Sequence, residues 1–259
     1  MKATLLSLLV LTAVVYAGLC ILLYVFQRSL MYFPTPAAST APAEELQVAN
    51  EGEELRIWRV QTDRALALLY FGGNAENVAL NIHDFRELFP QHAIYLVNYR
   101  GYGGSSGTPS ERALYSDAEA VFDRVAAEHR SVAVIGRSLG SAVATWLANR
   151  REVSRLALIT PADSFTSLAR RHYPLFPAAL LLKDRYDSLS RAGSIEVPVL
   201  FVVAEKDEII PPESSRRLAA AMASARVSFE VVPGAGHNTI GLAPRFRAAL
   251  ARFLAEDAK

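Results

Sequence analysis

The sequence predicts an α/β protein with three layers, in which helices cover both faces of a mainly parallel sheet. Short runs rich in apolar and β-branched residues alternate with longer stretches of helical character, a pattern typical of parallel strands joined through helices. The runs are continuously apolar, which indicates strands buried on both faces. After residue 33, about 226 of the 259 residues remain, enough for one domain with a large core.

The expected elements follow in order along the chain. Strands are predicted at residues 54–60, 65–71, 93–98, 131–135, 154–160, 197–203 and 227–232. Helices are predicted near residues 76–89, 111–128, 139–150, 213–224 and 243–255. Residues 34–42 read as a short extended linker. The connection at about 161–196 is long for this architecture, and we expect a short cap over the site or a surface helix packed on the core.

The first 33 residues predict a membrane helix and its juxtamembrane edge, followed by one domain at 34–259. No charged residue occurs from Ala3 to Phe26, and Lys2 and Arg28 flank this run. As a helix it would extend about 36 Å, more than the ~30 Å hydrocarbon core of a bilayer. We expect a single-pass anchor with an extracytoplasmic domain, an orientation that the flanking charges favour only slightly. The alternative is secretion after cleavage near Ala17, although the apolar run continues past that residue.

Charge and cysteine content exclude several other classes. The net charge is +1, so nothing indicates binding to nucleic acid or another polyanion. Cys20 is the only cysteine, which excludes an intrachain disulfide and a metal site built from several thiolates. No motif implies a metal or an organic cofactor, and we expect none.

Gly136-Arg-Ser-Leu-Gly140 is the most informative motif of the chain. It directly follows the apolar run at 131–135 and leads into a helical stretch. A serine on such a tight strand-to-helix turn projects its hydroxyl away from the backbone, and the two glycines remove side chains that would collide there. The following helix directs free N–H groups and the positive end of its dipole at the place where negative charge develops. Ser138 is therefore the candidate nucleophile.

A nucleophilic serine requires a base. The chain has five histidines, which are His83, His92, His129, His172 and His237. His83, His92 and His129 lie in or beside expected helices, where surface roles are expected. His172 comes before any plausible acid in the chain. The last lies in a glycine-bracketed loop directly after the expected strand at 227–232, where a side chain can reach a site at the end of a sheet. We therefore take His237 as the candidate base.

The orienting acid is expected between serine and histidine in chain order, on the loop after a later strand. The strand at 197–203 leads into a loop that contains Glu205, Asp207 and Glu208. Asp207 is the candidate, because it would fix the imidazole tautomer and stabilise the imidazolium ion; either neighbouring glutamate could substitute. Asp163, after an earlier strand, is a second possible acid, although we favour it as the N-cap of the helix that follows.

The remaining requirement is a pair of backbone donors for an oxyanion. One is expected to be the N–H group of Leu139, directly after the serine, and the other should come from the loop after an earlier strand. The strand at 65–71 ends in two glycines, which let the backbone turn sharply towards a ligand. We take the Asn74 N–H group as this donor, with Gly73 as the nearest alternative. A capping role for Asn74 or Asn77 is compatible with this.

Five segments together resemble the alpha/beta-hydrolase superfamily. They are Tyr70–Ala75, Asn98–Gly107, Gly136–Gly140, Ala204–Pro211 and Pro233–His237. Within the superfamily they are similar to a small membrane-anchored branch that includes serine aminopeptidase-like domains and depalmitoylase-type thioesterases. The match runs from about Gln27 to the C-terminus, in the order of the family's motifs. Gly72 departs from the pattern, since relatives often carry histidine there.

The resemblance and the motifs imply a serine hydrolase that cleaves carboxylic esters or thioesters through an acyl-enzyme. The expected fold is the three-layer alpha/beta-hydrolase fold with a short cap insertion and an N-terminal membrane helix. The expected partners are a small or lipid-like acyl substrate and the membrane, and the oligomeric state is left open. Two alternatives remain: an aminopeptidase-like serine peptidase, and a catalytically silent scaffold on the same fold.

Overall fold

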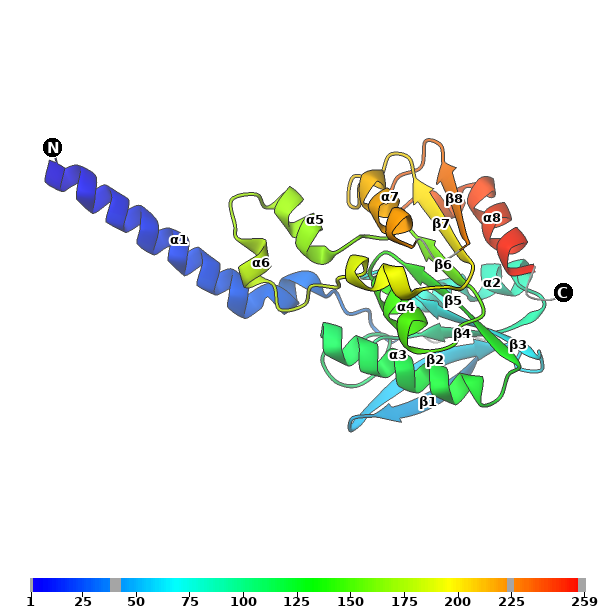
Figure 1. The fold of residues 1–259 in the computed structure, drawn as a ribbon. Helices are drawn as coiled ribbons and strands as arrows, with labels where there is room; N and C mark the ends of the chain where they lie inside the picture. The colour runs from blue at the N-terminus through cyan, green and yellow to red at the C-terminus, as the bar shows by residue number, and fades with distance from the viewer. Residues whose placement is uncertain (1, 38–42, 223–225, 256–259) are drawn as a thin grey trace.

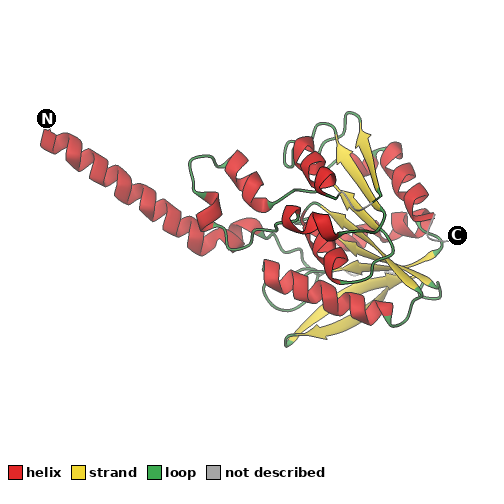
Figure 2. Ribbon diagram, viewed as in Figure 1, coloured by secondary structure: helices red, strands yellow, loops and turns green. Residues whose placement is uncertain are grey.

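A computed structural model describes residues 2–37, 43–222 and 226–255 of the chain (Figures 1 and 2). The second half of the expected linker, residues 223–224 of one expected helix and residues 256–259 of the expected domain lie outside the described residues. The strands are β1 (Glu44–Asn50), β2 (Glu53–Val60), β3 (Leu66–Phe71), β4 (His92–Val97), β5 (Ser131–Arg137), β6 (Leu156–Ile159), β7 (Val199–Ala204) and β8 (Val227–Val232).

The described helices alternate with these strands. The α-helices are α1 (Lys2–Met31), α2 (Ile82–Leu88), α3 (Glu111–Ala126), α4 (Leu139–Arg150), α5 (Phe165–His172), α6 (Ala178–Leu181), α7 (Pro212–Ala221) and α8 (Pro244–Ala255). Three short 3-10 helices join them, which are η1 (Val78–Asn81), η2 (Leu189–Ser194) and η3 (Ile240–Leu242). This order confirms the expected alternation of strands and helices.

The strands form one sheet in the order β1-β2-β4-β3-β5-β6-β7-β8. β2 pairs antiparallel with β1 and with β4, and the remaining pairs are parallel. The predicted three-layer architecture with a mainly parallel sheet is therefore confirmed. β1 was not predicted, because it is an edge strand with alternating burial and no continuous apolar run. Its two-residue turn to β2 places Glu51 and Gly52 at positive φ, as tight hairpins require.

Helices cover both faces of the sheet (Figure 1). α3, α4 and α7 pack with the strand side chains of one face, and α2 and α8 pack with those of the other. β3 shows the division within one strand, because Leu69 and Phe71 belong to the first core and Leu68 and Tyr70 belong to the second. Burial on both faces explains why the central strands read as continuous apolar runs.

The predicted helix at 76–89 begins later than expected. Its first turn is the 3-10 helix η1, capped by the Asn77 side chain, which accepts a hydrogen bond from the Ala79 N–H group. The α-helix proper begins only at Ile82. The loop between Gly72 and Asn77 is therefore longer than the sequence suggested, and it lies at the carboxyl end of β3.

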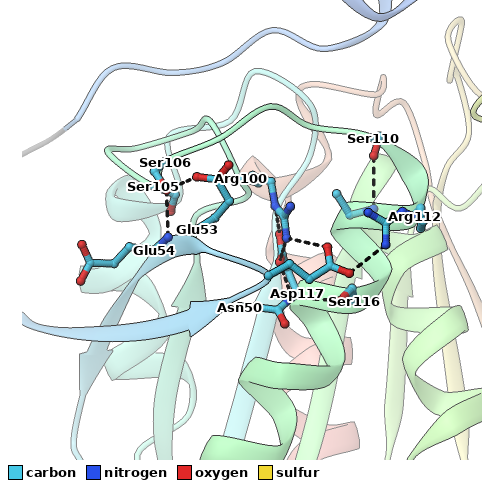
Figure 3. Close-up of polar contacts among 12 residues, drawn as sticks. Asn50, Glu53, Glu54, Arg100, Ser105, Ser106, Ser110, Arg112, Ser116 and Asp117 are labelled. Atoms are coloured by element: carbon cyan, nitrogen blue, oxygen red, sulfur yellow. Dashed lines mark hydrogen bonds and ion pairs between the residues drawn. The ribbon is translucent and has the colours of Figure 1, made fainter.

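A buried ion pair fixes the loop between β4 and α3 (Figure 3). Arg100 Nε donates to Asp117 Oδ2 at 2.9 Å, and a second guanidinium nitrogen donates to the other carboxylate oxygen. Asn50 Nδ2 adds a hydrogen bond of 2.8 Å to Asp117 Oδ1. The two charged side chains are only 8% and 5% exposed. The pair therefore ties the β4–α3 loop to α3 and to the β1–β2 hairpin.

The same loop carries two tyrosines that brace the loop after β3. The Tyr99 hydroxyl donates to the Gly72 carbonyl oxygen at 2.7 Å, and the Tyr102 hydroxyl donates to Asn74 Oδ1 at 2.7 Å. Gly103 directly follows Tyr102 with φ 57°, and a Cβ atom there would lie 2.0 Å from Asn98 Oδ1. This close approach requires glycine.

We predict that Asp117→Ala lowers the free energy of unfolding by about 3 kcal/mol, because the buried Arg100 guanidinium then keeps only the partly exposed Glu51 carboxylate, 3.5 Å away, as a counter-charge. Urea denaturation of the full chain in mild detergent measures the change. Asp123→Ala is the matched control, since its pair with Arg151 is 55% exposed at Asp123 and 29% at Arg151, and it should cost about 0.5 kcal/mol. Equal losses in the two variants would contradict the prediction.

Candidate active site

Ser138 stands on a strained turn between β5 and α4. Its backbone adopts φ 51° and ψ −114°, and a positive φ at a residue other than glycine costs about 1–3 kcal/mol. A Cβ atom added to Gly136 would lie 2.3 Å from the Gly140 carbonyl oxygen, and one added to Gly140 would lie 2.0 Å from the Phe71 carbonyl oxygen. The turn therefore packs so closely against itself and β3 that only glycine fits at both flanking positions.

The structure brings His237 and Asp207 into one row with Ser138. His237 Nε2 lies 2.9 Å from Ser138 Oγ, and His237 Nδ1 lies 2.8 Å from Asp207 Oδ2. The imidazole and carboxylate are 8% and 0% exposed. A carboxylate can only accept, so Nδ1 carries the proton and Nε2 is free to accept from the serine hydroxyl. The three side chains come from loops after β5, β7 and β8, which meet at one edge of the sheet.

The second oxygen of Asp207 is held by the backbone of its own loop. Asp207 Oδ1 accepts hydrogen bonds from the N–H groups of Ile209 at 3.0 Å and Ile210 at 2.7 Å. Both carboxylate oxygens are thus engaged, one by the loop and one by His237. This arrangement fixes the direction in which the carboxylate points and, through it, the plane of the imidazole.

The alternative acids have other partners. Glu205 Oε2 accepts from the Gly234 N–H group at 2.8 Å and so supports the loop that carries His237, whereas Glu208 is exposed. Asp163 accepts from Ser214 and pairs with Arg217. Burial raises the pKa of Asp163, but hydrogen bonds from the surrounding serines and Arg217 outweigh it and leave the pKa below its usual value.

Two expectations about these surroundings were wrong. The N-cap of α5 is Ser164, not Asp163, because the Ser164 side chain accepts from the Ser167 N–H group. Asp163 instead accepts from the Ser164 N–H group. His92 is 2% exposed rather than a surface residue, since it opens β4 and pairs in register with Leu66 of β3.

The loop after β3 lies directly beside the serine. A Cβ atom on Gly73 would lie 3.6 Å from Ser138 Cβ. The Gly73 N–H group is already engaged, since it donates to Glu76 Oε2 at 2.6 Å. Within the described part of the chain, the N–H groups of Asn74 and Leu139 make no hydrogen bond to a protein acceptor. Both N–H groups are therefore available to a ligand.

The Asn74 side chain holds the end of α1. Its Oδ1 accepts from the Phe33 N–H group at 3.1 Å, and its Nδ2 donates to the Met31 carbonyl oxygen at 2.5 Å. Since the side chain is committed to these contacts and to Tyr102, the backbone of Asn74 is fixed in place. The sequence indicated a role for the Asn74 backbone but gave no sign of this link to the N-terminal helix.

Glu76 and Arg137 join the loops of the site, and sequence reasoning missed both. Glu76 Oε1 accepts from the Tyr70 hydroxyl at 2.6 Å, and Glu76 Oε2 lies 3.2 Å from Arg137 Nη1. Arg137 Nη2 in turn donates to the His237 carbonyl oxygen at 3.4 Å. The side chains are 12% and 23% exposed. The available signal was an arginine beside the nucleophile, and a glutamate three residues after Gly73.

Three tyrosines around the site remain hydrogen-bond donors at neutral pH. Burial raises the pKa of Tyr70 and Tyr99 well above the usual value of 10. Burial also raises the pKa of Tyr102 to about 12. Their hydroxyls therefore keep their protons and donate to Glu76, Gly72 and Asn74 respectively.

One group of three potential metal ligands occurs among residues 2–37, 43–222 and 226–255, and it lies outside this site. His83, Asp84 and Glu87 are exposed on α2. Arg247 Nη1 lies 3.0 Å from Asp84 Oδ2, and Arg247 Nη2 lies 3.7 Å from Glu87 Oε2. The two carboxylates therefore already have a cationic partner, and the group is accounted for as a surface ion-pair cluster.

Comparison with known proteins shows the family to which this chain belongs. A sequence profile described as "Alpha/beta hydrolase family" matches residues 71–193, and one described as "Serine aminopeptidase, S33" matches residues 178–241. The uncharacterised protein Rv2307c of Mycobacterium tuberculosis is 34% identical, over 87% of this chain and 85% of that protein. The uncharacterised membrane protein YNL320W of Saccharomyces cerevisiae is 29% identical, over 83% of this chain and 84% of that protein.

The fold is similar to that of a solved enzyme. The esterase Pf2001 of Pyrococcus furiosus matches with a TM-score of 0.72 and 17% identity, over 87% of this chain and 99% of the esterase. The chain belongs to the alpha/beta hydrolase family.

Proposed function

We propose that this protein is a serine hydrolase that cleaves carboxylic esters or thioesters through an acyl-enzyme intermediate. The observation that carries the proposal is the unbroken hydrogen-bonded row from Ser138 Oγ through His237 to Asp207. A buried, oriented imidazole beside a serine on a strained turn is the arrangement that activates a hydroxyl for attack on a carbonyl.

In the proposed mechanism, Ser138 Oγ attacks the substrate carbonyl carbon while His237 Nε2 takes the hydroxyl proton. The negative charge that forms on the carbonyl oxygen is stabilised by the N–H groups of Leu139 and Asn74. The imidazolium then gives its proton to the departing alcohol or thiol, leaving an acyl-serine. Water, deprotonated by the same imidazole, hydrolyses this ester and restores the enzyme, with Asp207 orienting His237 throughout. No step uses a metal or an organic cofactor.

Glu76 and Arg137 have a positioning role in this proposal. Glu76 holds the Gly73 N–H group, one residue before the donor at Asn74. Arg137 connects Glu76 to the backbone of the His237 loop. Since a displacement of about 1 Å can cost 100-fold in rate, this link would keep the oxyanion donors and the base at fixed positions relative to Ser138.

A peptidase acting at free N-termini is the competing activity, supported by the serine aminopeptidase profile that matches residues 178–241. Such an enzyme needs a carboxylate near the serine that is free to bind the substrate ammonium group. Glu205 is occupied by the Gly234 N–H group, and Asp207 is occupied by His237 and its own loop. These contacts favour an ester or thioester over a peptide.

We also propose that α1 anchors the protein in a membrane, with the catalytic domain outside the cytoplasm. The helix contains a window with a mean hydropathy of 2.6 that has no buried residues. The relative YNL320W, which matches 83% of this chain, is described as a membrane protein. An exposed apolar helix of this length is long enough to span a bilayer core.

Ser138→Ala should reduce turnover of p-nitrophenyl esters by about five orders of magnitude, because no other group can form the acyl-enzyme. Ser190→Ala, at an exposed serine, is the control and should retain the full rate. Circular dichroism of both variants verifies that the fold persists. A Ser138→Ala enzyme that keeps the wild-type rate would remove this residue from the mechanism.

Short and medium acyl esters and thioesters should be hydrolysed faster than amides of the same acyl group. The reason is that the carboxylates of Glu205 and Asp207 are already engaged, and amines are poorer leaving groups than alcohols or thiols. Measuring kcat/KM for an acyl-length series and for a panel of dipeptide amides checks this. Efficient dipeptide cleavage with inert esters would reverse the assignment.

Glu76→Ala should lower kcat for a p-nitrophenyl ester by about 100-fold with a smaller effect on KM, because the oxyanion loop loses its support. Glu76→Gln keeps an acceptor for the Gly73 N–H group and should retain most of the rate. Glu208→Ala, at an exposed glutamate, controls for general changes of charge. Similar losses in the alanine and glutamine variants would show that charge, rather than positioning, is what Glu76 supplies.

A further inference from the structure

The connection between β6 and β7, where we expected a cap at about 161–196 and which we call the cap below, contains ten consecutive uncharged residues that the catalytic site does not use. This segment, residues 173–182, reads Tyr-Pro-Leu-Phe-Pro-Ala-Ala-Leu-Leu-Leu. Three of its large apolar side chains are exposed, Tyr173 by 64%, Leu175 by 80% and Leu180 by 79%. Basic residues flank it on both sides, with Arg170, Arg171 and His172 before it and Lys183 after it.

The tip of the segment lies against the apolar part of α1. The Tyr16 hydroxyl donates to the Leu175 carbonyl oxygen at 2.8 Å. The rings of Tyr16 and Phe176 stack with centroids 5.9 Å apart and planes 7° from parallel. Tyr16 precedes Arg28 by about 18 Å along the helix axis. The contact therefore lies well inside the uncharged stretch of α1.

The segment then returns along α1 to the charged end of that helix. Gln27 Nε2 donates to the Leu181 carbonyl oxygen at 2.9 Å, and Gln27 Oε1 accepts from the Lys183 N–H group at 2.7 Å. Arg28 Nε pairs with Asp184 Oδ2 at 2.8 Å. Figure 1 shows α6 beside the C-terminal part of α1, away from the sheet. Charged groups of α1 and the cap thus lie together at the C-terminal end of α1. Apolar groups of both lie nearer the N-terminus of that helix.

The backbone of the segment is suited to an environment without water. The N–H groups of Phe176, Ala178, Leu180, Leu181 and Leu182 all donate to carbonyl oxygens within the segment. Pro174 and Pro177 have no N–H group to satisfy. The Arg185 side chain donates to the carbonyl oxygens of Ala179 and Leu182. Backbone exposed to lipid must meet its hydrogen bonds internally, and this compact turn largely does so.

We propose that residues 173–182 insert into the membrane leaflet that surrounds the C-terminal half of α1, as a second membrane contact. The proposal rests on the anchoring role proposed for α1 and does not depend on the hydrolase activity. The contact with Tyr16 places Leu175 and Phe176 beside a helix surface that lies in lipid if α1 is inserted. The flanking Arg170, Arg171 and Lys183 then lie at the level of the headgroups, where basic side chains favour anionic lipid.

Depth-dependent fluorescence quenching tests the proposal on the full chain. The protein is labelled with an environment-sensitive dye at its sole cysteine, Cys20, or at a new cysteine in a Cys20→Ser background. The new positions are Leu175→Cys and Leu180→Cys in the segment, and Glu152→Cys as the matched control. Glu152 is exposed and precedes β6, at the opposite edge of the sheet from Ser138. Each protein is reconstituted in phosphatidylcholine vesicles with or without nitroxide-labelled acyl chains.

We expect lipid nitroxides to quench dyes at residues 20, 175 and 180 several-fold more than a dye at residue 152. Aqueous iodide should quench only the dye at 152. Quenching at residue 20 together with iodide access at residues 175 and 180 would overturn the proposal while leaving the anchor intact. A dye at residue 20 that iodide quenches would instead refute the anchor. If the dye at residue 175 is protected from iodide only at high protein density in the lipid, a second copy of the chain covers the segment. That result would also overturn the proposal.

Discussion

The site depends on the register of the parallel strands, which brings distant segments to one edge of the sheet. Phe71 at the end of β3 pairs with Gly136, and Ala204 at the end of β7 pairs with Val232. The loops after β3, β5, β7 and β8 therefore begin side by side. The Ser138 turn fits among them only because Gly140 approaches the Phe71 carbonyl oxygen more closely than any side chain would allow. A change in register between β3 and β5 would separate the serine from the loop that carries Gly73 and Asn74.

Polar contacts between these loops then fix the positions that strand pairing alone leaves free. Glu76 joins the loop after β3 to Arg137 beside the serine, and Arg137 reaches the backbone of the His237 loop. Glu205 supports the same loop through the Gly234 N–H group. Each of these contacts involves a charged side chain, and charge-assisted hydrogen bonds are shorter and stronger than those between neutral groups. Glu76, Arg137 and Glu205 thus link the loops that carry Ser138 and His237 to their neighbours through side-chain contacts.

The N-terminal helix is a structural part of the site rather than an appendage. Its end donates to and accepts from the Asn74 side chain through the backbone of Phe33 and Met31. It also binds the cap through Arg28 and Asp184, and the cap reaches the Asp207 loop, where His172 Nε2 lies 2.9 Å from the Ile209 carbonyl oxygen. Under the proposed anchoring, the same contacts would hold the site close to the membrane surface, where acyl lipids are concentrated.

Sequence patterns were enough to predict the fold class, the order of strands and helices and the candidates Ser138, Asp207 and His237, because glycines, continuous apolar runs and loop positions carry local information. It misplaced the cap of α5 and the burial of His92, and it missed β1, whose alternating edge pattern is weak. Glu76 and Arg137 could not be identified, since an ion pair between two loops leaves no periodic signal in either. Two features were decided only by the tertiary structure. The Gly73 N–H group is occupied by the Glu76 carboxylate, whereas the Asn74 N–H group has no acceptor among the described residues, and this depends on where Arg137 and Tyr70 hold the Glu76 side chain. The cap lies against α1 through Tyr16 and Leu175, two residues far apart in the chain whose distance no local pattern encodes.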